Sequence, residues 1–200
     1  MAEELKEWGI NPHANETHAK ITAWVSETDH RTGEMQIFAL SVLSKETVRH
    51  EGVHRAHILN THAPTPEMRK KLRGKYMAGE DVPRDFEAIS EALAGLAERN
   101  IRYKNQLVRT LDMIYKAGRG GKFLHAVRKR VLHLWEYLDK KNVPHEEKRW
   151  AIMQALYHSK NLRELNENIE AVKIWAELKK SGIRTSVREA LAMKRLGRWK

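Results

Sequence analysis

The sequence predicts an all-α protein, a helical bundle with an N-terminal helical arm. From residue 65 onward, apolar residues recur at steps of three and four, the spacing that places them on one face of an α-helix. Short runs containing glycine or proline separate these stretches, as in loops between packed helices. We therefore divide the chain into a histidine-rich N-terminal arm, residues 1–64, and a basic helical bundle, residues 65–200.

The arm is expected to be mainly helical, although one part of it has two interpretations. A short helix is expected over residues 1–8, and a longer one from 34 to 60, where apolar residues approach a single stripe. Residues 19–26 are also expected to be helical. The alternative places strands at 21–25 and 35–40 and joins them as a β-hairpin through Asp29-His30-Arg31-Thr32-Gly33.

Six helices are expected in the bundle. Thr65-Pro66-Glu67 is typical of a helix start, with threonine as the N-cap and proline in the first turn. The apolar stripe from Phe86 to Ile114 predicts a helix of some 30 residues, about 45–50 Å long, with Gly118 as its C-cap. Further apolar stripes place Trp135, Trp150 and Trp175 in the core or an interface, and Ser186-Val187-Arg188-Glu189 is a capping box for the last helix.

The most informative stretch is the basic amphipathic helix that follows Gly118-Arg119-Gly120-Gly121. Its apolar positions share one face, and its basic positions fall on the opposite face. The apolar set is Leu124, Val127, Val131, Trp135 and Leu138, and the basic set is Lys122, His125, Lys129 and His133. Such a helix can pack on a core and face an anionic partner, although an ordinary solvated face has the same pattern.

Charge is distributed unevenly along the chain. The formal net charge is +11, and it divides into −3 for residues 1–64 and +14 for residues 65–200. A basic bundle of this kind suits nucleic acid. The absence of cysteine excludes disulfides and thiolate-ligated metals. No apolar run has the length of a transmembrane helix, and residues 1–4 do not resemble a signal peptide.

His50-Glu51-Gly52-Val53-His54 matches the pattern H-E-x-x-H. On a helix the two histidines lie one turn apart and can ligate zinc, while Glu51 acts as the general base. The five residues resemble the site of zincin metallopeptidases, but position 60, where the metzincin pattern has a third histidine, is Asn60. The alternative interpretations are that these are ordinary surface or interface histidines, or that they hold a structural or incidental metal.

The remaining basic residues indicate contacts with a phosphate backbone. Lys116-Ala117-Gly118-Arg119-Gly120-Gly121-Lys122 is not a P-loop, because no strand precedes it and no serine or threonine follows the lysine. No base-reading motif is found, so binding is expected to be independent of sequence. The expected nucleic-acid contacts are Arg49, His50, His54, Arg55, His57, Arg69, Lys70, Arg73, Lys116, Arg119, Lys122, Lys129, Arg198 and Lys200.

Three features carry a resemblance to a known family in architecture and composition. They are the helical arm over residues 15–60, the break at Pro64-Thr65-Pro66 and the basic bundle from Met68 to Lys200. With these features the chain resembles the DNA-wrapping major coat proteins of filamentous viruses of hyperthermophilic archaea. The resemblance implies a structural protein of the virion that wraps double-stranded DNA without a cofactor. It also implies assembly with further copies or with a paralogous subunit, and no membrane. The net negative charge of the arm departs from that family, whose arm is expected to touch DNA.

Two other functions fit the sequence. One is a small zinc-dependent hydrolase that uses His50, Glu51 and His54. The other is a cellular, cytoplasmic helical subunit of a ribonucleoprotein complex that binds DNA or RNA. Stoichiometric zinc favours the hydrolase, and a monomer with modest salt-sensitive affinity favours the ribonucleoprotein subunit.

Overall fold

The chain forms two compact units, Met1–Val82 and Pro83–Lys200. The computed structural model describes residues 10–12, 26–28, 35–37, 45–61, 65, 67–68, 83–116 and 121–197. These two units divide after Val82, whereas the sequence analysis divides the chain after residue 64. Pro83 directly precedes a helix and accepts a hydrogen bond from Glu87 N at 3.1 Å, so it closes the first turn of that helix.

The described residues of the first unit include three short strands and one long helix. The strands are β1 (Ile10–Pro12), β2 (Ser26–Thr28) and β3 (Met35–Ile37), and the helix is α3 (Lys45–Thr61). The strand β3 lies in the middle of the sheet, parallel to β1 and antiparallel to β2. The helix α3 contacts β2 and β3.

The strands correct the expected helical arm. Residues 35–37 are a central strand, so the helix expected over 34–60 begins only at Lys45. Ser26 pairs with Ile37 and Thr28 pairs with Met35, so two antiparallel strands flank residues 29–34, as in the hairpin alternative, but the first of them is 26–28 and not 21–25. Residues 19–25, where a helix or the first strand is expected, lie outside the described residues. The turn-forming residues Asp29 and Gly33 lie between the paired strands, where a hairpin requires them. The expected helix over 1–8 lies outside the described residues.

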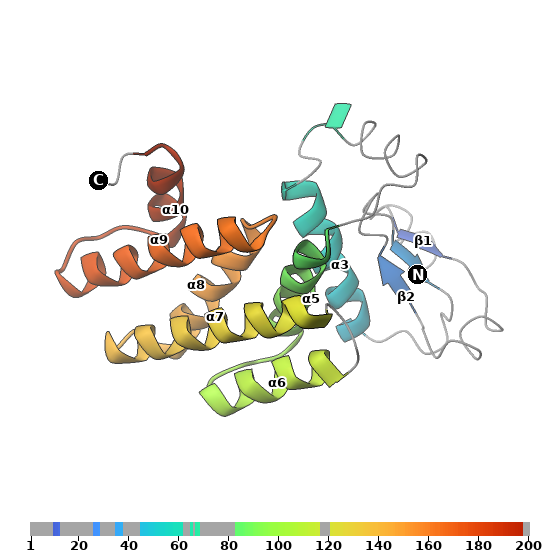
Figure 1. Cartoon of the computed structure of the whole chain (residues 1–200), viewed down its shortest axis with the longest axis horizontal. Helices are drawn as coiled ribbons and strands as arrows, with labels where there is room; N and C mark the ends of the chain where they lie inside the picture. Colours follow the sequence, from blue (N-terminus) through green and yellow to red (C-terminus); the bar gives the residue numbers. More distant parts are fainter. Residues whose placement is uncertain are drawn as a thin grey trace. The chain divides into compact units, whose positions relative to one another are not determined.

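The second unit is an all-α helical bundle, as predicted, and Figure 1 shows its helices. It contains α5 (Arg84–Glu98), α6 (Lys104–Lys116), α7 (Gly121–Lys140), α8 (His145–Tyr157), α9 (Leu162–Lys180) and α10 (Val187–Arg195). The helix α5 contacts α6, α7, α8 and α9, and Phe86 and residues 88–97 are buried. The bundle therefore has its core around α5.

The expected helix of some 30 residues is broken into α5 and α6. Arg149 of α8 donates to the carbonyl oxygens of Leu96 and Ala97, at 2.9 and 3.2 Å, and so satisfies the end of α5. Gln106 Oε1 accepts from the backbone N–H groups of Arg102 and Tyr103, at 2.8 and 3.1 Å, at the start of α6. Tyr103, which the sequence places on the apolar stripe, is 66% exposed in this turn.

The other expected elements of the bundle agree with the structure where it describes them. Thr65 Oγ1 accepts from Met68 N at 3.3 Å, as an N-cap does. The α10 helix begins with the predicted capping box of Ser186 and Glu189, and the chain turns after α9 at Gly182 with φ +78°. The expected C-cap Gly118 lies outside the described residues. No described helix is both long enough and apolar enough to cross a membrane.

Gly95 allows α5 and α6 to approach closely. A Cβ built at this position would lie 2.5 Å from Ile114 Cδ1 and 3.3 Å from Thr110 Cγ2. Both neighbours belong to α6, so any large side chain at position 95 must push the two helices apart. Glycine is otherwise a poor residue for a helix interior.

We predict that Gly95→Leu lowers the free energy of unfolding by about 1–3 kcal/mol, because overpacking forces α5 and α6 apart. Gly95→Ala should cost less, since the terminal methyl of Ile114 can move and alanine favours helix by about 1 kcal/mol. Urea unfolding followed by circular dichroism measures both changes. Equal stability of wild type and Gly95→Leu would contradict the close approach.

Candidate nucleic-acid interface

The helix α7 has the two faces that its sequence predicts. Leu124, Val127, Val131, Trp135 and Leu138 are all buried. On the other side Lys122, His125, Lys129 and His133 are all exposed. The amphipathic pattern therefore packs α7 on the core and leaves its cations in water.

Two ion pairs join one flank of α7 to α6. Arg128 Nε lies 2.8 Å from Asp112 Oδ1, and Lys104 Nζ lies 2.6 Å from Glu136 Oε1. The pairing with Lys104 lowers the pKa of the Glu136 carboxyl below its usual value. These pairs place Asp112 and Glu136 between the helices, and Glu136 also interacts electrostatically with Lys140 and His133 on the outward face.

The cations outside these pairs define a surface that we call the basic strip. It consists of Arg109 and Lys116 on α6 and of Lys122, Lys129 and Lys140 on α7, all exposed. On each helix the members recur at near-whole turns, seven or eleven residues apart, so they follow a single line on its outer face. The α6–α7 pair therefore presents two adjacent lines of positive charge.

The other flank of α7 meets α9, whose charges are balanced. Arg130 Nε donates to Asn166 Oδ1 at 2.6 Å, and the Tyr137 hydroxyl donates to Glu177. Burial, and then this hydrogen bond, raises the pKa of Tyr137 to about 12, so the hydroxyl stays protonated.

Within α9 there are four cations and four acids. Arg163 pairs with Glu167 at 3.1 Å, and Lys173 pairs with Glu170 at 2.7 Å. Glu177 also lies 2.5 Å from Lys141 of the α7–α8 turn. The outer faces of α6 and α7 are therefore positive, as is α10 with three cations and one acid, whereas the charges of α9 are balanced.

The structure places three of the expected contact residues together. Lys116, Lys122 and Lys129 belong to the basic strip, and Lys122 Nζ lies 5.6 Å from the centre of the Phe123 ring. The sequence reading missed Arg109 and Lys140, although the seven-residue step from Arg109 to Lys116 signals a shared helix face.

The remaining expected contacts lie elsewhere. His50, His54 and His57 are on α3 in the other unit, and His54 and His57 are buried, so the interface that we propose does not use these two. Arg49 and Arg55 also belong to α3, but their side chains are outside the described part of the chain. Six further expected contacts lie wholly outside the described residues: Arg69, Lys70, Arg73, Arg119, Arg198 and Lys200.

His50 and His54 approach each other on successive turns of α3. Their Nε2 atoms are 3.1 Å apart, and their rings meet edge to face with centres 4.7 Å apart. His54 is only 2% exposed, unlike an ordinary surface histidine. The side chain of Glu51, the expected general base, lies outside the described part of the structure.

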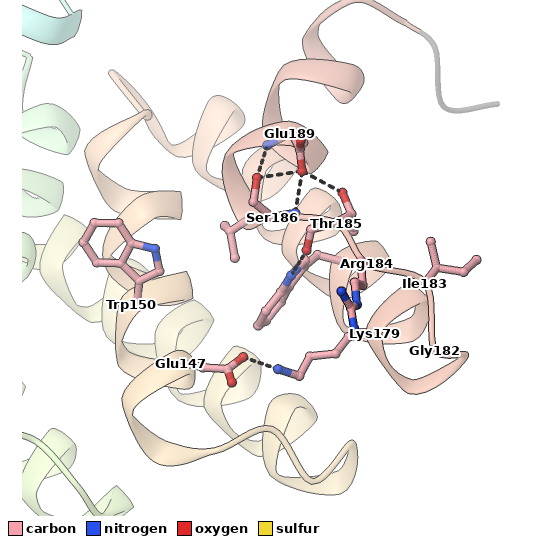
Figure 2. A pocket seen from close by; sticks show the side chains of 11 residues that line it. Glu147, Trp150, Lys179, Gly182, Ile183, Arg184, Thr185, Ser186 and Glu189 are labelled. Carbon is pink, nitrogen blue, oxygen red and sulfur yellow. Dashed lines mark hydrogen bonds and ion pairs between the residues drawn. The ribbon is translucent and has the colours of Figure 1, made fainter.

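A pocket of about 560 Å³ opens where α8, α9 and α10 meet (Figure 2). Trp150 and Trp175 line it, together with the chain from Gly182 to Val187. Trp175 is buried, and its indole N–H donates to Thr185 O at 3.1 Å. Trp150, expected in a core or an interface, is 47% exposed, and the Arg188 guanidinium lies over its ring, 5.7 Å from the centre.

Three charged groups that line this pocket, Glu147, Lys179 and Glu189, have partners within the bundle, and the fourth, Arg184, is exposed. Lys179 pairs with Glu147 and also lies over the Trp175 ring, 5.8 Å from its centre. Glu189 accepts from the backbone N–H of Ser186 at 2.6 Å and from its hydroxyl at 2.8 Å (Figure 2). The pocket is therefore better suited to apolar contact than to catalysis.

Comparison with protein-family models, curated proteins and solved structures finds no match to this chain.

The capping box makes a prediction about pH. Hydrogen bonds from the backbone and side chain of Ser186 lower the pKa of Glu189 below 4.5, so its carboxylate stabilises α10 above that pH. We expect Glu189→Gln to be less stable than wild type at neutral pH. The difference should shrink as the pH falls below 4.5 through the folded-state pKa, because the wild-type carboxylate then becomes neutral.

Thermal unfolding of both proteins at neutral pH and in acid measures this difference. Glu146→Gln, an exposed acid at the start of α8, is the matched control. A difference that grows in acid would contradict the assignment.

Proposed function

We propose that this chain is a structural nucleic-acid-binding protein, a coat or nucleocapsid subunit that wraps duplex DNA and assembles with further copies of itself. The basic strip is the observation that carries this proposal. Its five cations lie on the outer faces of two helices, and two neighbouring acids, Asp112 and Glu136, are held in pairs between α6 and α7. The viral assignment rests on the resemblance in architecture and composition described above.

The dimensions of α7 suit a phosphate backbone. At 1.5 Å per residue, Lys122 and Lys129 are separated by about 10 Å along the helix, and Lys122 and Lys140 by about 27 Å. Duplex DNA carries one charge per roughly 1.7 Å of its axis, so a helix of this length spans many phosphates. Each lysine that meets a phosphate releases counterions, and this release drives binding without reading bases.

The residue types favour contact with the backbone over readout of sequence. Three of the five members of the basic strip are lysines on α7, which act as point charges and do not form the planar two-bond contacts typical of base recognition. The exposed histidines His125 and His133 lie on the same face and add ring N–H donors. Such a surface accepts any duplex sequence.

A candidate surface for self-assembly lies around the pocket where α8, α9 and α10 meet. Trp150, Ile183 and Leu196 are large apolar side chains that are each about half exposed or more, and the first two line the pocket. Exposed apolar residues gathered at a hollow are typical of protein interfaces. In the proposed assembly a second copy of this chain covers them.

We predict that Lys122→Ala combined with Lys129→Ala weakens duplex DNA binding and makes it less sensitive to salt. Each lost phosphate contact should reduce the slope of log K against log salt by about 1. Fluorescence anisotropy of a labelled duplex at several salt concentrations measures both effects. Two duplexes of different sequence should bind alike.

The control is Lys173→Ala combined with Arg163→Ala, which also removes two cations but takes them from the balanced α9 surface. This control should keep the wild-type salt slope. If both pairs of substitutions weaken binding equally, the net charge of the bundle would explain the affinity and the basic strip would not.

We also predict regular filaments of the protein with duplex DNA in negative-stain images, and their loss in Trp150→Asp. A charged side chain at this position should prevent a second copy from covering the pocket, while α8 stays folded because Trp150 is already half exposed. Monomers that bind DNA or RNA with modest affinity would contradict the coat function and favour the ribonucleoprotein subunit.

A further inference from the structure

We infer that His50 and His54 of α3 bind a divalent transition-metal ion, with zinc as the first candidate. The two imidazoles lie on successive turns of a 17-residue helix, so the backbone fixes the distance between them. Their Nε2 atoms approach to 3.1 Å, and His54 is almost fully buried. Nothing in the proposed DNA contact uses this pair.

The distance between the nitrogens fits coordination of one ion. Zinc binds histidine nitrogen at about 2.0–2.1 Å in tetrahedral geometry, which places two such nitrogens about 3.3 Å apart. The observed 3.1 Å is within a few tenths of an ångström of that value. An ion between the two rings would replace the hydrogen bond that joins them and would leave the helix unchanged.

The chemistry of the pair selects the class of ion. Imidazole nitrogen suits zinc, copper and nickel, whereas magnesium and calcium prefer oxygen ligands. Two histidines occupy two of four tetrahedral positions, and the other two are left to water or to oxygen ligands from outside α3. The site assigned here is therefore a binding site that ties two turns of α3 together, and it includes no reaction step.

The test uses the full chain, loaded with zinc and dialysed. We expect one zinc ion per chain and a rise in the melting temperature with zinc. His50→Ala and His54→Ala should each weaken zinc binding at least tenfold and abolish that rise. His133→Ala is the matched control, because it removes one exposed histidine from α7 and should leave both readouts unchanged.

A second measurement distinguishes loss of the metal site from misfolding of a variant, which is needed because His54 is buried. Cobalt in place of zinc gives a visible absorption spectrum that reports nitrogen ligands, and His50→Gln, at the less buried position, should lose that spectrum while its circular dichroism stays that of the wild type. The absence of bound zinc, or zinc that is kept in both alanine variants, would overturn the inference. Neither result bears on DNA binding by α6 and α7, so the two proposals fail separately.

Discussion

The second unit depends on one constraint, the burial of α5 among its neighbours. This helix combines large apolar residues with alanines and Gly95, so four other helices can approach it. Small residues shorten the distance between axes, and the large ones fill the space between them. Because α6 and α7 both pack on α5, their outer faces are held side by side, and the basic strip is a consequence of how the core is built.

Polar contacts then determine where the helices end. Arg149 satisfies the last carbonyl groups of α5, and the Asp139–Lys148 ion pair, with Lys148 also lying 4.9 Å from the centre of the Trp135 ring, ties α7 to α8. Lys148 is nearly buried, so its charge needs that partner. These contacts bring distant parts of the chain together at turns, and they keep the helices short enough to form a compact bundle.

Much of the bundle could be predicted, because periodicity and capping are local signals. The buried and exposed faces of α7 and the Ser186–Glu189 capping box follow from residues within one or two turns of each other. The break between α5 and α6 could not be predicted in this way, since the group that ends α5 comes from α8, more than 50 residues away. The strand at 35–37 was expected only in the hairpin alternative, because three residues are too few to show a decisive alternating pattern.

The candidate interface was only partly predictable. Lys116, Lys122 and Lys129 were expected from charge runs, but a run does not tell which cations are neutralised by acids on the same surface. Trp150 shows the same limit for apolar residues. Its apolar stripe predicts a packed side chain, and only the fold shows that the bundle leaves about half of it exposed.

The balanced charges of α9 contrast with the positive outer faces of α6 and α7. Two copies that meet through their α9 sides bring balanced charges together, whereas two copies that meet through α6 and α7 repel each other unless a polyanion lies between them. In the assembly that we propose, DNA is then the component that allows the basic sides of neighbouring subunits to converge. On the proposed function, the subunits would stay dispersed while nucleic acid is scarce and would condense along it when it is present.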